Sequence, residues 1–313
     1  MPLHAQAQAL CDLVNAMGEV TPSDARLQEM RDGFAGLVAM AAGGAEAVFA
    51  IEDVDADGVP ARVYRPSPDP DLPVVVYLHG GGWTIGTAAQ YDLVTRQVAN
   101  ATGAIVVSVD YRLAPEHPFP AALDDCWRAL VWAAKNASSF GGDGSRLALM
   151  GDSAGGNLAA VCALLARDAG TPQIASQVLV YPVVDCDLDT SSYRENGKGY
   201  FLTEADMRWF FSCYTGDGET RTERTEWRVS PLRAPDLRGV APAVVVTAEF
   251  DPLRDEGRAY AHALEQAGVP VVHHEYEGMI HGFFGLSAAF DASRDAMRRV
   301  SVELRRSFGT LSD

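Results

Sequence analysis

A single serine framed by two glycines stands where a predicted strand gives way to a predicted helix. Residues 146–150 are mostly apolar and indicate a buried strand, and the Ala/Leu-rich run 157–168 indicates a helix. Between them lies Gly151-Asp152-Ser153-Ala154-Gly155, whose glycines avoid the crowding that side chains would cause in a sharp turn. Such a turn places the Ser153 hydroxyl beside the N–H groups of a helix N-terminus, which favour developing negative charge. The alternative is an ordinary tight turn with a serine at the helix cap, so the segment needs partners elsewhere in the chain.

Strands and helices are expected to alternate along most of the chain. Continuous apolar runs such as 74–78 and 243–246 predict strands that are buried on both faces, and therefore a mostly parallel sheet between layers of helices. The expected strands are 47–54, 60–65, 73–78, 104–109, 146–150, 177–181, 243–248 and 271–276. The helices expected between and after them are 90–101, 120–137, 155–168, 253–267 and 288–307. The fold class predicted from this rhythm is α/β.

Two regions do not follow the alternation. Residues 1–45 have the apolar spacing of two amphipathic helices. The segment 186–226 is too long for a single crossover between strands and contains a helix expected at about 203–215. We expect this segment to be an insertion over the carboxyl edge of the sheet.

Charge and cysteine usage exclude several kinds of partner and site. A net charge of -17 argues against nucleic acid and anionic membranes as partners. No run approaches the roughly 18 apolar residues of a membrane span, and the N-terminus has no basic-then-apolar leader. The odd number of widely spaced cysteines predicts reduced thiols, neither a disulfide scaffold nor a zinc site, and a cytoplasmic protein. These cysteines are Cys11, Cys126, Cys162, Cys186 and Cys213.

A run of three glycines directly follows the strand expected at 73–78. In His79-Gly80-Gly81-Gly82-Trp83, the glycines let the backbone approach a substrate and turn its N–H groups toward it. A phosphate cradle is the rival interpretation, but Ile85 stands where a dinucleotide fingerprint needs its third glycine, and no Gly-Lys-Ser/Thr follows. Paired with the Ser153 turn, the run predicts donors for an oxyanion.

A nucleophilic serine needs a base and an acid that orients the base. His281 follows the strand expected at 271–276, and Asp251 follows the strand at 243–248, so both are expected at the carboxyl edge of the sheet with Ser153. Glu249 is the rival for the acid. Asp152 is expected to point away from the site and to brace neighbouring loops.

Taken together, these motifs resemble the hormone-sensitive-lipase-like branch of the α/β-hydrolases, the bacterial family IV carboxylesterases. The chain order of the serine, the acid and the histidine is also the order of that fold. The segments that carry the resemblance are His79-Gly80-Gly81-Gly82-Trp83, Asp110-Tyr111-Arg112-Leu113-Ala114-Pro115-Glu116, Gly151-Asp152-Ser153-Ala154-Gly155-Gly156, Asp251-Pro252-Leu253-Arg254-Asp255-Glu256-Gly257 and His281-Gly282-Phe283.

The resemblance implies an eight-stranded sheet with one antiparallel strand and a helical cap. The cap would comprise 1–45 and 186–226, and the α/β-hydrolase core would comprise 46–185 and 227–313. The implied catalytic residues are Ser153 as nucleophile, His281 as base and Asp251 as acid. The implied oxyanion hole consists of the N–H groups of Gly81, Gly82 and Ala154.

The function implied is a serine carboxylesterase for short- to medium-chain acyl esters, with no cofactor and no metal. The segment 193–214 is rich in aromatic residues, and its helical face either packs the cap onto the core or lines an acyl pocket. The expected substrate-binding residues are Trp83, Leu202, Met207, Phe210 and Phe211. An amidase, formamidase or small peptidase on the same fold stays open, and a non-catalytic receptor is a remoter alternative. The protein is expected to be a monomer or a homodimer, with the strand 270–276 as a possible pairing edge.

Overall fold

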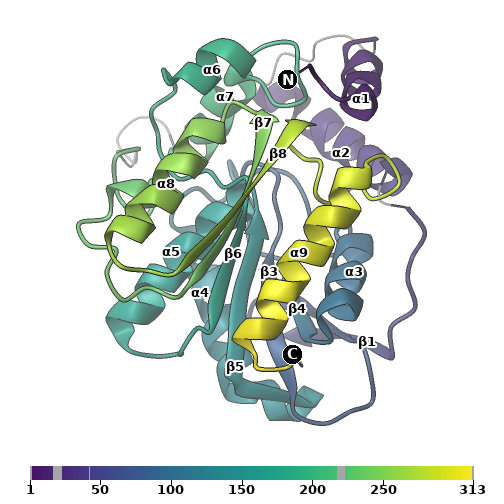
Figure 1. Ribbon diagram of the computed structural model, residues 1–313, viewed down its shortest axis with the longest axis vertical. Helices are drawn as coiled ribbons and strands as arrows, with labels where there is room; N and C mark the ends of the chain where they lie inside the picture. Colours follow the sequence, from purple (N-terminus) through teal and green to yellow (C-terminus); the bar gives the residue numbers. More distant parts are fainter. Residues whose placement is uncertain (1, 17–22, 42, 217–222, 312–313) are drawn as a thin grey trace.

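A single twisted sheet forms the centre of the computed structural model, which describes residues 2–16, 23–41, 43–216 and 223–311 (Figure 1). The described residues form eight strands in the order β1-β2-β4-β3-β5-β6-β7-β8 across the sheet. In chain order they are β1 (Ala50–Asp55), β2 (Pro60–Arg65), β3 (Leu72–Leu78), β4 (Ile105–Val109), β5 (Gly142–Asp152), β6 (Ser176–Val180), β7 (Ala243–Phe250) and β8 (Val271–Ile280). The predicted α/β fold with a mostly parallel sheet is confirmed.

One strand runs against the others. β2 pairs antiparallel with both β1 and β4, whereas every pair from β4 to β8 is parallel. The residues of β3 from Pro73 to Leu78 are buried, as expected for a central parallel strand that has helices on both faces. Because parallel strands end at the same edge, the segments that follow β5, β7 and β8 come together there.

Helices cover both faces of the sheet. α4, α5 and α8 pack on one face, whereas α3 and α9 pack together on the other (Figure 1). The helices in chain order are α1 (Ala5–Ala16), α2 (Leu27–Ala41), α3 (Asp92–Thr102), α4 (Ala121–Asn136), α5 (Ala154–Ala169), α6 (Ser191–Asn196), α7 (Glu204–Thr215), α8 (Arg254–Gln266) and α9 (Asp291–Ser307). Within the described ranges, no helix is both long enough and apolar enough to cross a membrane.

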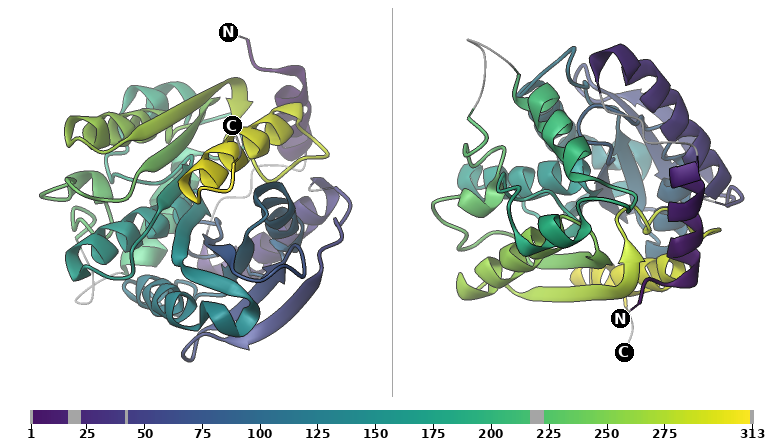
Figure 2. Two further views of the ribbon diagram at one scale, coloured as in Figure 1. Left: turned by 60° about the horizontal axis from the view of Figure 1, so that its bottom comes forward. Right: turned by 90° about the horizontal axis from the view of Figure 1, so that it is seen from above.

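Four helices lie beyond the carboxyl edge of the sheet. α1 and α2 come from the N-terminal region, and α6 and α7 come from the segment between β6 and β7. Seen from above, α1 and α2 lie on one side of this end of the molecule, and α6 and α7 lie on the other (Figure 2, right). The side chain of Thr203 accepts a hydrogen bond from Asp206 N–H at the start of α7, while the Asp206 carboxylate accepts one from Thr203 N–H. The division of the chain into cap and core at 45, 185 and 226 stays a prediction.

Candidate active site

Ser153 occupies the tight turn between β5 and α5. Its backbone has φ 56° and ψ -119°, a conformation that side chains rarely adopt, and Ser153 N–H donates to Val180 O at 2.8 Å. The flanking glycines are required by space. A Cβ on Gly151 would lie 2.3 Å from Gly155 O, and a Cβ on Gly155 would lie 1.9 Å from Leu78 O. The turn therefore pushes the serine hydroxyl out of the sheet edge, where the segments after β7 and β8 arrive.

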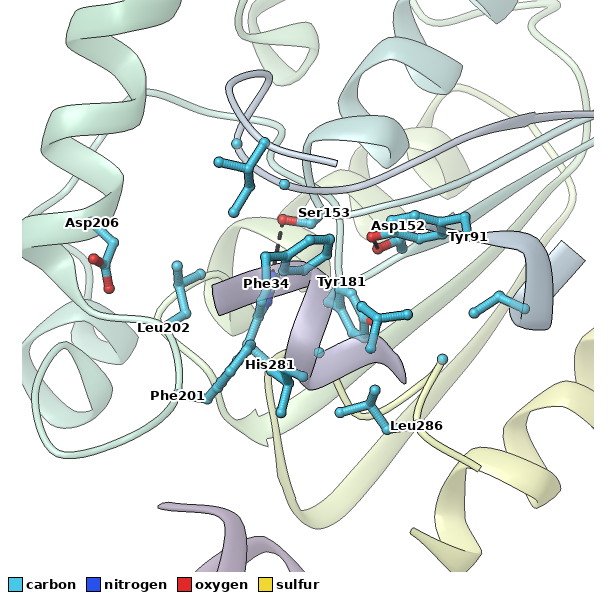
Figure 3. A pocket seen from close by; sticks show the side chains of 18 of the residues that line it. Phe34, Tyr91, Asp152, Ser153, Tyr181, Phe201, Leu202, Asp206, His281 and Leu286 are labelled. Carbon is cyan, nitrogen blue, oxygen red and sulfur yellow. Dashed lines mark hydrogen bonds between the residues drawn. The ribbon is translucent and has the colours of Figure 1, made fainter. Parts of the chain in front are cut away.

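The three side chains expected to meet form one chain of hydrogen bonds. His281 Nε2 lies 2.9 Å from Ser153 Oγ (Figure 3), and His281 Nδ1 lies 2.7 Å from Asp251 Oδ2. Asp251 is fully buried and also accepts from Leu253 N–H at 2.9 Å, which fixes its carboxylate. An ionised carboxylate only accepts, so Nδ1 carries the proton and Nε2 accepts from the serine hydroxyl. This tautomer is the one that a general base needs.

Glu249, the rival for the acid, lies elsewhere. Its carboxylate accepts from Gly278 N–H at 2.6 Å and so ties the end of β7 to the end of β8. The pairing of these two strands is irregular between Ala248 and Phe250, and Glu249 occupies that irregular position. Glu249 thus contacts the strand that precedes His281 and is no part of the Ser153–His281–Asp251 chain.

The glycine loop presents backbone donors beside Ser153. Gly81 and Gly82 have φ of 111° and 58°. Thr84 N–H donates to Gly81 O at 3.0 Å and the Thr84 hydroxyl donates to Gly82 O at 2.8 Å, so the carbonyls turn away from the site. In the described part of the chain, no backbone oxygen accepts from the N–H of Gly81 or Gly82, and both residues line the same cavity as Ser153. Ala154, the first residue of α5, directly follows the serine and is buried.

Asp152 holds the glycine loop in place through hydrogen bonds. Its carboxylate accepts from the hydroxyls of Tyr77 at 2.9 Å and Tyr91 at 3.0 Å, and from Gly80 N–H at 3.1 Å. Burial raises the pKa of Asp152, and the two tyrosine hydroxyls oppose that shift. Burial also raises the pKa of both tyrosines, which keeps their hydroxyls protonated as donors. The bracing role expected for Asp152 is present: its carboxylate lies beside Tyr91, although the residue also lines the cavity (Figure 3).

His79 braces the same loop from within it. Its ring stacks on Tyr111 with centroids 4.2 Å apart, and its Nδ1 lies 2.8 Å from Gly80 O. Burial lowers the pKa of His79, so the imidazole is neutral and Nδ1 donates to that carbonyl.

An apolar cavity of about 200 Å³ opens in front of Ser153 (Figure 3). One wall comes from α2 and α3, and the opposite wall comes from the segment that leads into α7 and from α7 itself. In Figure 3, Leu202 and Asp206 lie on one side of Ser153, and Tyr91 and Leu286 lie on the other. The lining residues are Phe34, Leu37, Val38, Tyr77, Gly81, Gly82, Ile85, Tyr91, Val94, Asp152, Ser153, Tyr181, Phe201, Leu202, Asp206, Phe210, His281, Gly282, Gly285 and Leu286.

Comparison with known proteins agrees with this geometry. A family model described as alpha/beta hydrolase fold matches residues 75–285. The chain belongs to this α/β-hydrolase family. Carboxylesterase NlhH of Mycobacterium tuberculosis (strain CDC 1551 / Oshkosh) is 45% identical over 253 residues, which cover 79% of this chain and 78% of the relative. Ethyl acetate hydrolase of Pseudomonas putida is 35% identical, over 98% of this chain and 99% of the relative.

Solved structures of α/β-hydrolases superpose on nearly the whole chain. Ester-hydrolase EH1AB1 from the metagenome of Lake Arreo, complexed with a derivative of bipyridine phosphonate, has a TM-score of 0.91 and 38% identity, and the match covers 98% of this chain and 100% of that one. The esterase of the archaeon Pyrobaculum calidifontis has a TM-score of 0.88 and 39% identity, with 97% and 99% covered. The predicted membership of the hormone-sensitive-lipase-like branch is confirmed.

The substrate-binding residues expected from the sequence divide into two groups. Leu202 and Phe210 line the cavity of this hydrolase. Trp83, Met207 and Phe211 do not, because they are buried in the packing between α7 and the core, with at most 1% of each exposed. The helical face that carries Met207, Phe210 and Phe211 therefore both packs the cap and lines the cavity, with different residues for each.

Sequence reasoning missed the opposite wall. Phe34, Leu37 and Val38 of α2 face the cavity, together with Val94 of α3 and Tyr91, which directly precedes α3. The helical spacing of the α2 residues was a signal for a buried face, but a face that packs on a core and a face that lines a cavity have the same period. Among the residues that the structure describes, no three His, Cys, Asp or Glu side chains gather as a metal ion would need.

Proposed function

We propose that this protein is a serine carboxylesterase that hydrolyses short- to medium-chain acyl esters through an acyl-enzyme intermediate. The observation that carries the proposal is the continuous hydrogen-bond chain Ser153–His281–Asp251, which ends at an apolar cavity beside the N–H groups of the glycine loop. The named carboxylesterases among its relatives support the same reaction.

Acylation begins with Ser153 Oγ attacking the ester carbonyl carbon while its proton passes to His281 Nε2. Asp251 stabilises the imidazolium that forms. The negative oxygen of the tetrahedral intermediate accepts from the N–H groups of Gly81, Gly82 and Ala154, at about 3–4 kcal/mol for each such donor in comparable enzymes. His281 then protonates the alcohol oxygen, the C–O bond breaks and the alcohol leaves.

Deacylation repeats these steps with water. His281 takes a proton from a water molecule, whose oxygen attacks the acyl carbon of the Ser153 ester. The second tetrahedral intermediate uses the same backbone donors. When it collapses, Ser153 Oγ leaves as it regains its proton from His281, and the carboxylic acid is released.

The size of the cavity supports short acyl groups. At about 200 Å³ it lies below the roughly 300–1,000 Å³ of typical small-molecule pockets, and its lining is mostly apolar. The relative named ethyl acetate hydrolase supports small esters as well. Leu202 and Phe210 would contact the substrate from the side of α7.

Ser153→Ala is the test of this function. We expect hydrolysis of p-nitrophenyl butyrate to fall on the order of 10⁴-fold or more, since the remaining activity comes from binding and the oxyanion donors alone. A fluorophosphonate probe should label the wild-type protein and leave the folded variant unlabelled. Near-wild-type hydrolysis by folded Ser153→Ala would end the proposal, and faster turnover of anilides than of matched esters would favour an amidase.

We also propose a cytoplasmic location and a monomeric or homodimeric state. All five cysteines are free thiols, four of them buried, as is common in reducing compartments. β8 is an edge strand of the sheet, and such strands either need protection or pair with a second copy. Cell fractionation and light scattering after size exclusion test the two statements separately.

A further inference from the structure

We propose that Tyr214 of α7 is a positioning residue for the oxyanion hole, acting through the indole of Trp83. The inference rests on the proposed esterase function and adds a role for the cap helix: α7 holds the glycine loop in its active conformation as well as lining the cavity.

Three consecutive residues of the loop adopt positive φ. Gly81, Gly82 and Trp83 have φ of 111°, 58° and 59°. Glycine adopts such values freely, but a bulky residue is strained there, because its Cβ approaches its own backbone. Strain of this kind persists only when the surroundings hold the residue in place. Trp83 therefore needs contacts that outweigh its preference for negative φ.

α7 supplies these contacts. The rings of Trp83 and Tyr214 stack with centroids 4.3 Å apart and an interplanar angle of 3°. The ring centroid of Phe211, one turn earlier on α7, lies 5.4 Å from that of the indole. Trp83 is fully buried. Because Trp83 directly follows Gly82, the stack holds the backbone next to a predicted oxyanion donor.

Tyr214 is itself fixed by the core. The rings of Tyr214 and Phe119 are nearly perpendicular, with centroids 5.7 Å apart and an interplanar angle of 86°. The Tyr214 carbonyl also accepts a hydrogen bond from Phe119 N–H at 2.7 Å. Tyr214 is thus held through both its side chain and its backbone, and it provides a rigid surface for the indole. Its hydroxyl is buried and has no hydrogen-bond partner among the described residues, so the ring and not the hydroxyl makes the contact.

A second contact joins α7 to the loop one residue earlier. A Cβ on Gly82 would lie 2.2 Å from Cδ1 of Phe210, so the Phe210 ring lies directly against the Gly82 backbone. Trp83 O accepts from Ala114 N–H at 2.9 Å, which fixes the far side of Trp83. If Trp83 relaxed toward negative φ, Gly82 would have to absorb the change, and its N–H would turn from the oxyanion position.

Replacing the Tyr214 ring tests this role. In Tyr214→Leu, or in Tyr214→Met if the first variant does not fold, we expect kcat for p-nitrophenyl butyrate to fall about tenfold or more with KM within about twofold. Oxyanion donors act mainly in the transition state, which is why kcat carries the loss. Tyr214→Phe keeps the ring and should retain kcat within about twofold of the wild type.

Tyr260→Leu is the matched control, because Tyr260 on α8 is also fully buried with an unpartnered hydroxyl among the described residues. It should lower the thermal midpoint as Tyr214→Leu does but leave kcat within about twofold of the wild type.

Inhibition by butylboronic acid separates this role from a loss of stability, because a less stable protein that is still folded should bind the inhibitor as before. Ser153 Oγ bonds to boron, its proton passes to His281, no group leaves, and one boron oxygen enters the oxyanion hole. The inhibition constant of butylboronic acid should rise in Tyr214→Leu by about the same factor by which kcat falls. An unchanged kcat and inhibition constant in Tyr214→Leu, or an equal loss of kcat in Tyr260→Leu, would overturn the proposal. A wild-type protein without esterase activity would instead overturn the proposed function.

Discussion

The proposed catalytic residues and the cavity wall of this enzyme are held in place by different forces. Ser153, Asp251 and His281 follow three parallel strands and are joined by hydrogen bonds of 2.7 and 2.9 Å. The side of the cavity near α7 includes Leu202 and Phe210, whose positions depend on how α7 packs. Hydrogen bonds are directional and fix atoms to a fraction of an ångström, whereas apolar packing tolerates substitutions of similar volume.

This difference predicts that reaction chemistry and substrate preference separate under mutation. A change among the hydrogen-bonded residues should remove turnover for all esters alike. A change in the cavity wall should alter the ratio between esters and leave the mechanism intact. The predictions below test that separation, beginning with the largest expected effect.

Asp251→Asn should lower kcat by about 10⁴-fold, as the loss of the orienting carboxylate does in other serine hydrolases. An asparagine amide offers N–H as well as oxygen, so His281 is no longer held with its proton on Nδ1. The rates for p-nitrophenyl esters of different acyl length should fall by the same factor. A changed order of preference among these esters would show that Asp251 also shapes the cavity, and it would contradict the separation of reaction chemistry from substrate preference.

Phe211→Ala should act on stability and not on preference. Phe211 is fully buried, beside Trp83 and outside the cavity lining, and truncating a buried phenylalanine costs about 3–5 kcal/mol of unfolding free energy. Urea unfolding measures that loss. The ratio of kcat/KM between long and short acyl esters should stay at the wild-type value, and any shift toward longer chains would contradict the assignment of Phe211 to packing.

The difference between the hydrogen-bonded residues and the cavity wall also explains which features the sequence predicts well. Buried parallel strands are continuous apolar runs, and the residue types that follow them are visible as short motifs. Ser153, Asp251 and His281 were therefore placed from their positions after strands, since parallel strands bring their carboxyl ends to one edge. Nothing about their exact distances was needed, because the fold itself brings them together.

The cavity wall could not be predicted in the same way. Phe210 and Phe211 are neighbours on one helical face, about 100° apart at 3.6 residues per turn, and a modest rotation of α7 would exchange their roles. That rotation is fixed by the stack of Tyr214 on Trp83, a contact between residues far apart in the sequence. Tyr77 and Tyr91 were missed for a similar reason, since buried tyrosines look like core residues until Asp152 is seen to accept from both hydroxyls.

Phe210→Ala gives the smallest effect and the sharpest comparison. Removing this ring enlarges the cavity on the side of α7, and each additional methylene that finds apolar contact contributes about 0.8 kcal/mol. We expect about two of the four additional methylenes of octanoate to find such contact, so the ratio of kcat/KM for p-nitrophenyl octanoate over butyrate should rise roughly tenfold. Because a ratio cancels any loss common to both esters, it is insensitive to the contact between Phe210 and Gly82.

Phe211→Ala removes the same ring one residue away and is the matched control for this ratio. A result on the opposite wall of the cavity, formed by α2, would contradict the role of Phe210 in substrate preference. An unchanged ratio in Phe210→Ala, together with a raised ratio in Val38→Ala, would place the acyl chain against α2, since Val38 lines the cavity on that side. The alcohol would then lie against α7, and substrate preference would be set by the N-terminal helices rather than by α7.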